Sequence, residues 1–233
     1  MAPLHHPRES TVSDAYREAL YPLGLLAIAA FFLRFLVQWI RSERAGQSVV
    51  PALFWQLSLF GNAVMWLHGT IQVQFPVSLL QSQHLVLSWR NLALLRERSS
   101  LMRRRGVICL LVASAISTTL VFFLQATHPF SSLVTWCRSP SGIANYPFSI
   151  LLLGFCGLFI SSLRFWVQWL DAERKQTSLL GPSFWWLSLV GTIFASIYFL
   201  LILDWINLLG TLFAIIPYAR NVRLTKKMKA CPP

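Results

Sequence analysis

The sequence predicts an all-α integral membrane protein with seven transmembrane helices, arranged as two parallel three-helix repeats joined by a linker helix. Three observations predict this class: the composition, a series of apolar runs near the ~20 residues that cross a bilayer core, and a motif that occurs twice. Of the 233 residues, 55% are hydrophobic and 12% are charged. Soluble domains carry roughly 25% charged residues, so the composition excludes an ordinary soluble protein.

Seven apolar runs supply the expected helices. Five of them are strongly apolar: Leu20–Ile40, Val50–Ile71, Val107–Leu124, Phe148–Leu170 and Phe184–Leu203. Two are shorter or more polar and complete the set: Phe75–Leu95 and Trp205–Ala219. In the first run, Ala27 and Ala29 form the A-x-A pattern of a signal-peptidase site. Because this run matches a helix deep in the chain, we expect it to be a transmembrane helix that is not cleaved.

The basic residues predict the orientation. A net charge of +12 would indicate nucleic acid in a soluble chain. If the seven helices alternate sides, however, fifteen Lys and Arg residues fall on one side, and only Arg8, Arg17 and Arg138 fall on the other. Cytoplasmic loops carry such an excess of positive charge. We therefore predict a multi-pass protein with its N-terminus outside and its C-terminus in the cytoplasm, and no nucleic-acid partner.

A motif near the N-terminus returns later in the chain. RFLVQWIRSER, residues 34–44, is matched by RFWVQWLDAER, residues 164–174, and further matches follow at the same spacing of 130 positions. Three helices plus a linker helix return the chain to its starting side, so both units insert in the same orientation. A pseudo-twofold axis along the membrane normal then relates them. The predicted segments are an N-terminal segment at 1–19, repeats at 20–96 and 147–221, a linker helix with loops at 97–146, and a basic tail at 222–233.

The matched residues resemble a known family. Each copy has R-F-x-x-Q-W, a Pro before F-W, S-L-x-G and a closing R-N, which is similar to the lipid-A-disaccharide synthase N-terminal domain family. The resemblance covers about 34–95 and 164–224, and the family is grouped in fold with the SWEET and PQ-loop proteins. It implies a role in lipid A or related glycolipid synthesis, in the inner membrane of a Gram-negative bacterium. The family's name refers to the enzyme that joins two acylated glucosamines.

The sequence offers no catalytic constellation to accompany that name. No predicted strand precedes a Gly-rich turn, as a sugar-nucleotide site would require. No nucleophile, carboxylate pair or metal-ligand spacing stands out, and the four cysteines form no CxxC pair. We therefore expect no cofactor or metal, assign no catalytic residue, and do not expect the chain to be catalytic by itself.

Two arginines inside apolar helices are the strongest binding candidates. Arg34 and Gln38 lie one helical turn apart on one face, and Arg164 and Gln168 repeat this arrangement. Inserting an arginine into the membrane costs free energy, and an arginine that faces lipid makes no interaction that offsets this cost. We therefore expect both arginines to face the protein interior. Opposed guanidiniums suit phosphate or carboxylate oxygens, which predicts a lipid-phosphate site at these four residues. The alternative is that each arginine pairs with the glutamate of its own repeat and ties a loop to its helix.

Other matched residues form two further groups. A set of charged and amide side chains is expected either to rim a cytoplasmic vestibule or to form ion pairs that fix helix ends: Glu43, Arg44, Glu173, Arg174, Arg90, Asn91, Arg220 and Asn221. Four tryptophans are expected to form a sugar or acyl-chain platform: Trp39, Trp55, Trp169 and Trp185. For the pairs Phe54-Trp55 and Phe184-Trp185, the alternative is that they anchor the chain at the membrane interface. His68 and His84 occur only in the first repeat, where we expect them to line a cavity.

The matched polar residues gather in the predicted cytoplasmic half. This distribution favours a protein that binds a phosphorylated glycolipid from the cytoplasmic side and presents or translocates it. A SWEET-like transporter of a small solute such as a sugar would instead concentrate matched polar groups at the midplane. A third possibility is a membrane anchor that docks a glycosyltransferase. The expected partners are thus a membrane lipid or phosphorylated glycolipid, and a glycosyltransferase for the anchor.

Overall fold

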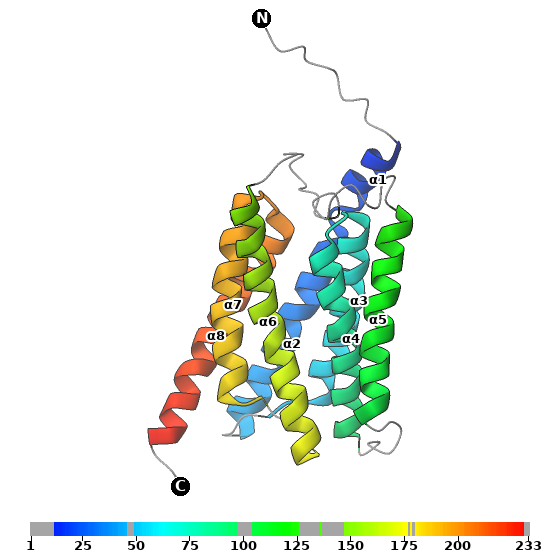
Figure 1. Ribbon diagram of the computed structural model, residues 1–233. Coiled ribbons are helices and arrows are strands. Elements are labelled where there is room, and N and C mark those ends of the chain that lie inside the picture. The colour runs from blue at the N-terminus through cyan, green and yellow to red at the C-terminus, as the bar shows by residue number, and fades with distance from the viewer. Residues whose placement is uncertain are drawn as a thin grey trace, which may run out of the picture.

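The computed structural model describes residues 12–45, 49–96, 104–125, 136, 147–176, 178 and 180–230, with the backbone alone at 12–14 and 224–230. All regular secondary structure in these residues is helical (Figure 1). The helices are α1 (Val12–Leu20), α2 (Leu23–Ala45), α3 (Ala52–Ile71), α4 (Phe75–Leu95), α5 (Arg104–Gln125), α6 (Phe148–Lys175), α7 (Pro182–Leu201) and α8 (Trp205–Ala230). The all-helical prediction is confirmed. The short α1 was not predicted, because its polar sequence carries no apolar run.

Local sequence explains where the helices begin and end. Pro51 precedes α3 in extended conformation, and Pro182 is the first residue of α7, a position where the missing N–H is harmless. α6 ends where Gln176 turns to a left-handed conformation. The helices α2, α6 and α8 continue beyond their apolar runs because Arg, Glu and Lys are also good helix formers. Only the apolar part of each helix could be read from hydropathy.

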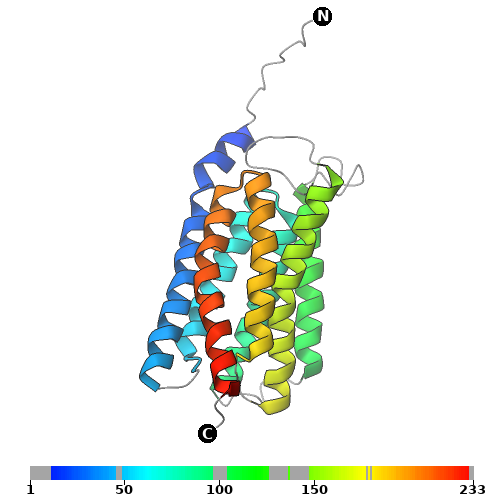
Figure 2. The ribbon, with the colours of Figure 1, turned by 90° about the vertical axis from the view of Figure 1, so that its left-hand side faces the viewer.

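The helices form two three-helix units. The first unit is α2–α4 and the second is α6–α8, and in each the first and third helices run in the same direction (Figures 1 and 2). The units meet along two seams, one between α4 and α6 and one between α2 and α8. Helix α5 packs on α4, outside the first unit. We call the end where α2, α4 and α6 finish the arginine-rich end, because Arg44, Arg90, Arg174 and Arg220 lie there.

Four helical stretches among the described residues are long and apolar enough to cross a membrane: Ala15–Ala45, Arg104–Gln125, Phe148–Lys175 and Pro182–Leu201. The helices α3, α4 and α8 have a similar length or are longer, but polar residues interrupt their apolar stretches. Their polar side chains are largely buried between helices, among them Asn62, Ser88 and Asn207. These buried polar residues lower the hydropathy of α3, α4 and α8.

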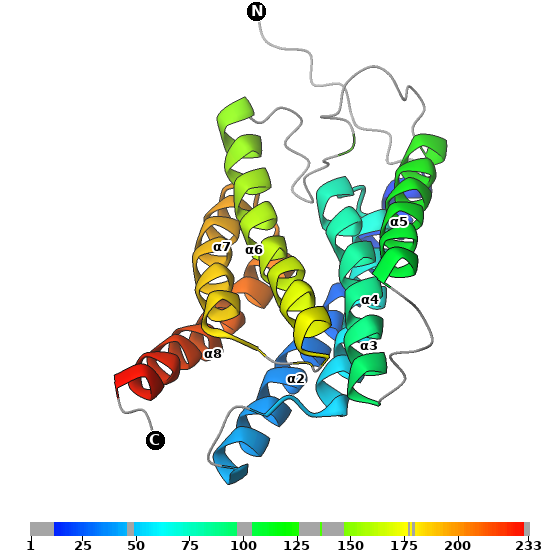
Figure 3. The ribbon, with the colours of Figure 1, turned by 60° about the horizontal axis from the view of Figure 1, so that its bottom comes forward.

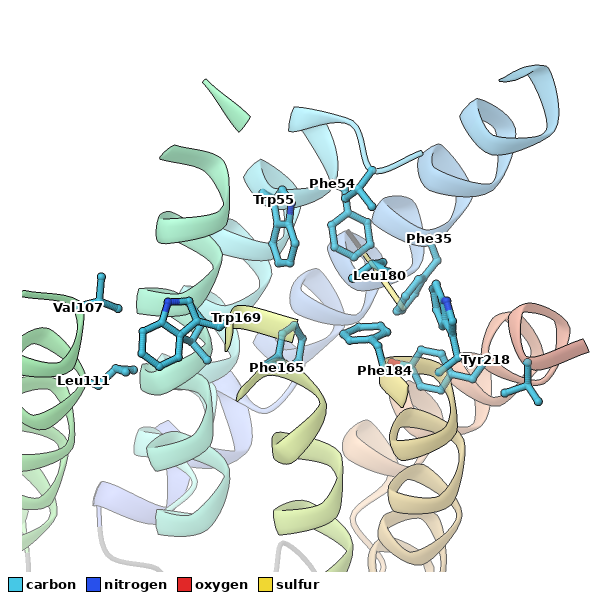
Figure 4. Packing of buried hydrophobic residues seen from close by; sticks show 14 residues of the cluster. Phe35, Phe54, Trp55, Val107, Leu111, Phe165, Trp169, Leu180, Phe184 and Tyr218 are labelled. Atoms are coloured by element: carbon cyan, nitrogen blue, oxygen red, sulfur yellow. The ribbon is translucent and has the colours of Figure 1, made fainter. Parts of the chain in front are cut away.

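An aromatic cluster joins the two units near the arginine-rich end (Figure 4). Phe35 of α2 meets Tyr218 of α8 edge to face, with ring centroids 5.2 Å apart, and Phe165 of α6 meets Phe184 of α7 at 5.7 Å. This geometry is favourable for aromatic pairs. The same cluster buries Trp55 and Trp185 almost completely, at 0% and 1% exposure. The expectation that these two tryptophans anchor the chain at the membrane interface is therefore wrong, because both face neighbouring helices.

Candidate functional site

A cavity between the two units is the centre of the candidate site. Its volume is about 840 Å³, counting the space that opens to the surroundings, and α2, α3, α4, α6, α7 and α8 all contribute to its lining. We call it the central cavity. Its polar lining includes Arg34, Asn62, His84, Arg164, Thr192 and Tyr218. Arg34 and Arg164 come from equivalent positions of α2 and α6, and they are only 4% and 9% exposed. Both arginines thus face inward, as expected.

The two guanidinium groups have few polar partners. Nη1 of Arg34 donates to Oγ of Ser58 at 3.1 Å, and its guanidinium lies 4.5 Å from the centre of the Phe31 ring. The guanidinium of Arg164 lies 4.8 Å from the Phe165 ring and 5.2 Å from the Tyr218 ring. The Nε atoms of both arginines are buried and lack a hydrogen-bond partner within the described part of the chain. Such donors can bind an acceptor that enters the cavity.

The charges around the central cavity favour an anion. No Asp or Glu belongs to the cavity lining that the structure describes. The acidic partners that local pairing would have used are engaged elsewhere: Glu43 pairs with Arg220, and Glu173 pairs with Arg90. A buried charge without a counter-ion is costly, and a bound anion would remove that cost. Planar guanidinium donors match phosphate and carboxylate oxygens.

The glutamines predicted for the same site lie elsewhere. Nε2 of Gln168 donates to Oδ1 of Asn91 at 2.6 Å, and Nδ2 of Asn91 donates back to Oε1 of Gln168 at 2.9 Å. This reciprocal pair bridges α4 and α6. Gln38 donates to Oγ of Ser42, 3.1 Å away on its own helix. Neither glutamine lines the central cavity. The structure therefore brings together two of the four predicted residues and assigns the others to the seams.

The predicted rim contains two matched ion pairs that cross between the units. Nε of Arg90 lies 2.6 Å from Oε1 of Glu173, and the second guanidinium bond, Nη2 to Oε2, measures 3.0 Å. Arg220 pairs with Glu43 in the corresponding way. Since 90 and 220, and likewise 43 and 173, differ by 130, each unit donates an arginine to the other unit's glutamate. The other two charged rim residues, Arg44 and Arg174, are exposed at the arginine-rich end.

The tryptophans that accompany these glutamates differ in exposure. Nε1 of Trp39 donates to Glu43 at 3.0 Å, and Nε1 of Trp169 donates to Glu173 at the same distance. Trp39 is 46% exposed, whereas Trp169 is 3% exposed. Because Trp55 and Trp185 are buried as well, Trp39 is the one member of the predicted platform that a ligand could reach from outside.

Histidine positions divide between the cavity and the opposite end. His84 lines the central cavity, where its Nε2 lies 3.3 Å from Oγ of Ser162. His68 is fully buried near the opposite end, and its ring centroid lies 5.6 Å from that of Tyr21. The expectation of cavity lining therefore describes His84 and not His68.

A buried network at the opposite end was not foreseen. Asp204, which is 0% exposed, accepts hydrogen bonds from Tyr21 Oη at 3.1 Å, from Nδ2 of Asn207 at 2.8 Å and from Nε2 of Gln74. Gln74 and Asp204 are 130 positions apart, and each follows a residue with positive φ in the turn that joins the second and third helices of its unit. Extending the 130-residue spacing into these turns would have paired the two residues.

The fold and site define a class of protein. The molecule is a helical protein with membrane-spanning character, built from two three-helix units around a cationic central cavity. The Lipid A Biosynthesis N-terminal domain family matches the chain twice, at residues 23–93 and 153–223, and these matches cover more than half of its length. The chain therefore belongs to the Lipid A Biosynthesis N-terminal domain family, in two tandem copies. The predicted family membership is confirmed.

Curated relatives carry the name lipid-A-disaccharide synthase. The protein of Chlamydia muridarum (strain MoPn / Nigg) is 39% identical over 212 residues, which is 89% of this chain and 34% of the relative. The protein of Chlamydia pneumoniae is 35% identical over 219 residues, which is 92% of this chain and 35% of the relative. The chain thus spans about a third of the length of these relatives. No solved structure matches the chain significantly. Family and helices together indicate a membrane-associated protein of a Gram-negative bacterium.

Proposed function

We propose that this chain binds the phosphate of a glycolipid in the central cavity and presents or translocates that lipid during lipid A synthesis. Arg34 and Arg164 hold the phosphate, and their Nε atoms, which have no hydrogen-bond partner among the described residues, supply donors to it. One observation carries the proposal: two buried guanidiniums from equivalent helices line one cavity whose described lining contains no carboxylate. Family membership supplies the glycolipid context.

In the proposed orientation, the arginine-rich end faces the cytoplasm and all seven long helices cross the inner membrane. The positive-inside rule supports this orientation. The helices α3, α4 and α8 cross within the bundle, where their polar residues contact other helices instead of lipid. The arginines then lie within the membrane, near its cytoplasmic surface. A lipid phosphate that enters the bundle from the cytoplasmic side can reach them.

The test is glycolipid binding by a double variant, Arg34→Gln/Arg164→Gln. We expect purified wild-type protein in detergent to bind a diacylated glucosamine phosphate, and the double variant to lose at least about 100-fold in affinity. Hydrogen bonds to charged groups contribute about 1.5–3 kcal/mol each, and two such groups are removed. The matched control is Arg44→Gln/Arg174→Gln, which removes the same two charges from exposed positions also 130 residues apart. Equal affinities of the two double variants would refute the phosphate site.

A second function, as a membrane anchor for a glycosyltransferase, is favoured by the relatives. In proteins named lipid-A-disaccharide synthase, the matched region is only about a third of the chain. The remaining two thirds are large enough to hold a transferase domain. If this function alone applies, the chain will associate with a lipid-A-disaccharide synthase, and the Arg34→Gln/Arg164→Gln variant will retain full lipid A synthesis in cells.

A further inference from the structure

A groove follows the seam between α2 and α8, beside the central cavity. Its volume is about 810 Å³, counting the space that opens to the surroundings. α2 contributes residues from Ile28 to Trp39, and α8 contributes residues from Gly210 to Asn221. At 1.5 Å per residue, these stretches give a groove about 16 Å long. We call it the α2/α8 groove; Figure 2 shows the two helices side by side.

The α2/α8 groove has an apolar length and a polar end. Toward the opposite end its walls are aliphatic and aromatic, and they include Phe32 and Phe213, whose ring centroids lie 6.1 Å apart. Toward the arginine-rich end the lining changes to Gln38, Arg220 and Asn221. This distribution matches one amphipathic ligand, an acyl chain that carries an anionic group at one end. Both Phe32 and Phe213 are about half exposed on the outer face of the bundle, where the proposed orientation places lipid.

The groove and the central cavity share part of their walls. Ile28, Phe31, Phe35, Gly210 and Ala214 line both spaces. A ligand lying in the groove is therefore separated from Arg34 by side chains and not by a helix. The Phe31 ring, against which the Arg34 guanidinium packs, forms part of this partition.

The ion pair at the polar end of the groove is more exposed than its counterpart in the other seam. The side chains of Arg220 and Glu43 are 29% and 60% exposed, whereas those of Arg90 and Glu173 in the other seam are 3% and 10% exposed. Exposed pairs contribute only about 0–1 kcal/mol. Breaking the Arg220–Glu43 pair therefore requires little free energy, and the Arg220 guanidinium, which also lies 4.8 Å from the Trp39 ring, could then turn to an incoming phosphate.

We propose that the α2/α8 groove is the lateral access route of the glycolipid: an acyl chain occupies the groove while the phosphate passes from Arg220 to Arg34 and Arg164. The proposal rests on the proposed function, because it names the route to the same cavity. It commits to a phosphorylated glycolipid that remains partly in the bilayer. An extended sugar or a water-soluble phosphate ester has no acyl chain to occupy the apolar part of the groove.

Photo-crosslinking tests the route. Phe213 is replaced by the photoreactive analogue benzoylphenylalanine, and Phe60 on α3 is replaced in the same way as the control. Both are phenylalanines of similar exposure, 46% and 54%, and Phe60 lies outside the groove. Phe213 is seven residues from Arg220 and Phe60 is eight from Ala52, so both lie about 10–12 Å from the arginine-rich end. The full chain is illuminated in vesicles of phosphatidylethanolamine and phosphatidylglycerol that contain a diacylated glucosamine phosphate.

We expect glycolipid adducts, relative to phospholipid adducts, to be enriched about tenfold at Phe213 over Phe60. Equal ratios at the two positions would overturn the route, and so would labelling of Phe213 by ordinary phospholipid at the same relative yield as by glycolipid. The same vesicles report the binding function separately through the Arg34→Gln/Arg164→Gln variant. If that variant loses binding while the two adduct ratios are equal, the phosphate site in the central cavity is supported and only the proposed access route is refuted.

Discussion

The two seams between the units are built from equivalent residues, yet one seam is tightly packed and the other contains a groove. In the α4/α6 seam, Gln168 and Asn91 bond reciprocally and the Arg90–Glu173 pair is buried. In the α2/α8 seam, the equivalent Gln38 and Asn221 bond within their own helices, and a groove separates them. Figure 3 shows α2 and α8 diverging toward the arginine-rich end.

Two features distinguish the seams. Ser42, which bonds Gln38 within α2, is replaced by Ala172 in α6, and the linker helix α5 packs beside only one seam. Val107 and Leu111 of α5 pack in the same cluster as Trp169, and the Arg104 guanidinium lies 5.9 Å from the Trp169 ring (Figure 4). α5 thus covers the α4/α6 seam from outside. The equivalent Trp39 is contacted by the Arg220 guanidinium, which lies 4.8 Å from its ring, but no counterpart of α5 packs on it in the described part of the chain, and it remains half exposed. A duplicated sequence produces two different seams because the copies differ at Ser42 and Ala172, and because a single unduplicated helix can cover only one seam.

The buried and exposed ion pairs give the largest expected contrast. Glu173→Ala should lower the free energy of unfolding by about 3 kcal/mol, because it leaves the buried Arg90 without its carboxylate partner. Glu43→Ala, the equivalent change in the open seam, should cost less than about 1 kcal/mol. Denaturation of the purified proteins in mixed micelles measures both. Equal losses would show that the two seams do not differ in the way described.

The amide pair gives the next contrast. Asn91 accepts hydrogen bonds from Gln168 and Ser178 and donates to the carbonyl oxygens of Leu87 and the Gln168 side chain. Asn91→Ala should therefore cost about 1–3 kcal/mol by leaving buried groups unsatisfied. Asn221→Ala removes only one such bond, to Pro217. We expect its cost to be at most about half as large in the same denaturation assay, and the reverse order would contradict the closure of the α4/α6 seam.

A substitution that partly fills the α2/α8 groove should have a smaller effect, on glycolipid affinity instead of stability. A Cβ atom at Gly210 would lie 3.2 Å from Cγ1 of Ile28, so Gly210→Leu places a side chain between the groove and the central cavity. Glycolipid affinity should fall about tenfold, which corresponds to 1.4 kcal/mol, with protein yield maintained. Gly181→Leu is the control, because no atom lies within 4 Å of a Cβ at that position. Unchanged affinity in Gly210→Leu would argue against passage through the seam.

The helices and the inward orientation of the two arginines could be predicted, because each depends on a short stretch of sequence and not on how the helices pack. Apolar length locates a span, and α4 begins and ends where its run predicts, at Phe75 and Leu95. The cost of exposing a guanidinium to lipid predicts that Arg34 and Arg164 face inward. The partners of Gln38 and Gln168 differ partly because Ser42, which accepts from Gln38, is replaced by Ala172 in the second copy. The bond from Gln168 to Asn91 of the other unit could not be predicted, because it depends on how α4 and α6 pack. The burial of Trp55 and Trp185 likewise depends on the neighbouring helices.

Binding of matched lipids tests the central cavity most directly. Native mass spectrometry of the purified full chain compares a diacylated glucosamine phosphate with the same glycolipid lacking the phosphate, so that the acyl chains and sugar are held constant. Two buried guanidiniums with no carboxylate in the described lining of their cavity should favour the phosphorylated lipid by at least about tenfold. Equal occupancy by the two lipids, or a preference for the uncharged one, would contradict a phosphate site at Arg34 and Arg164.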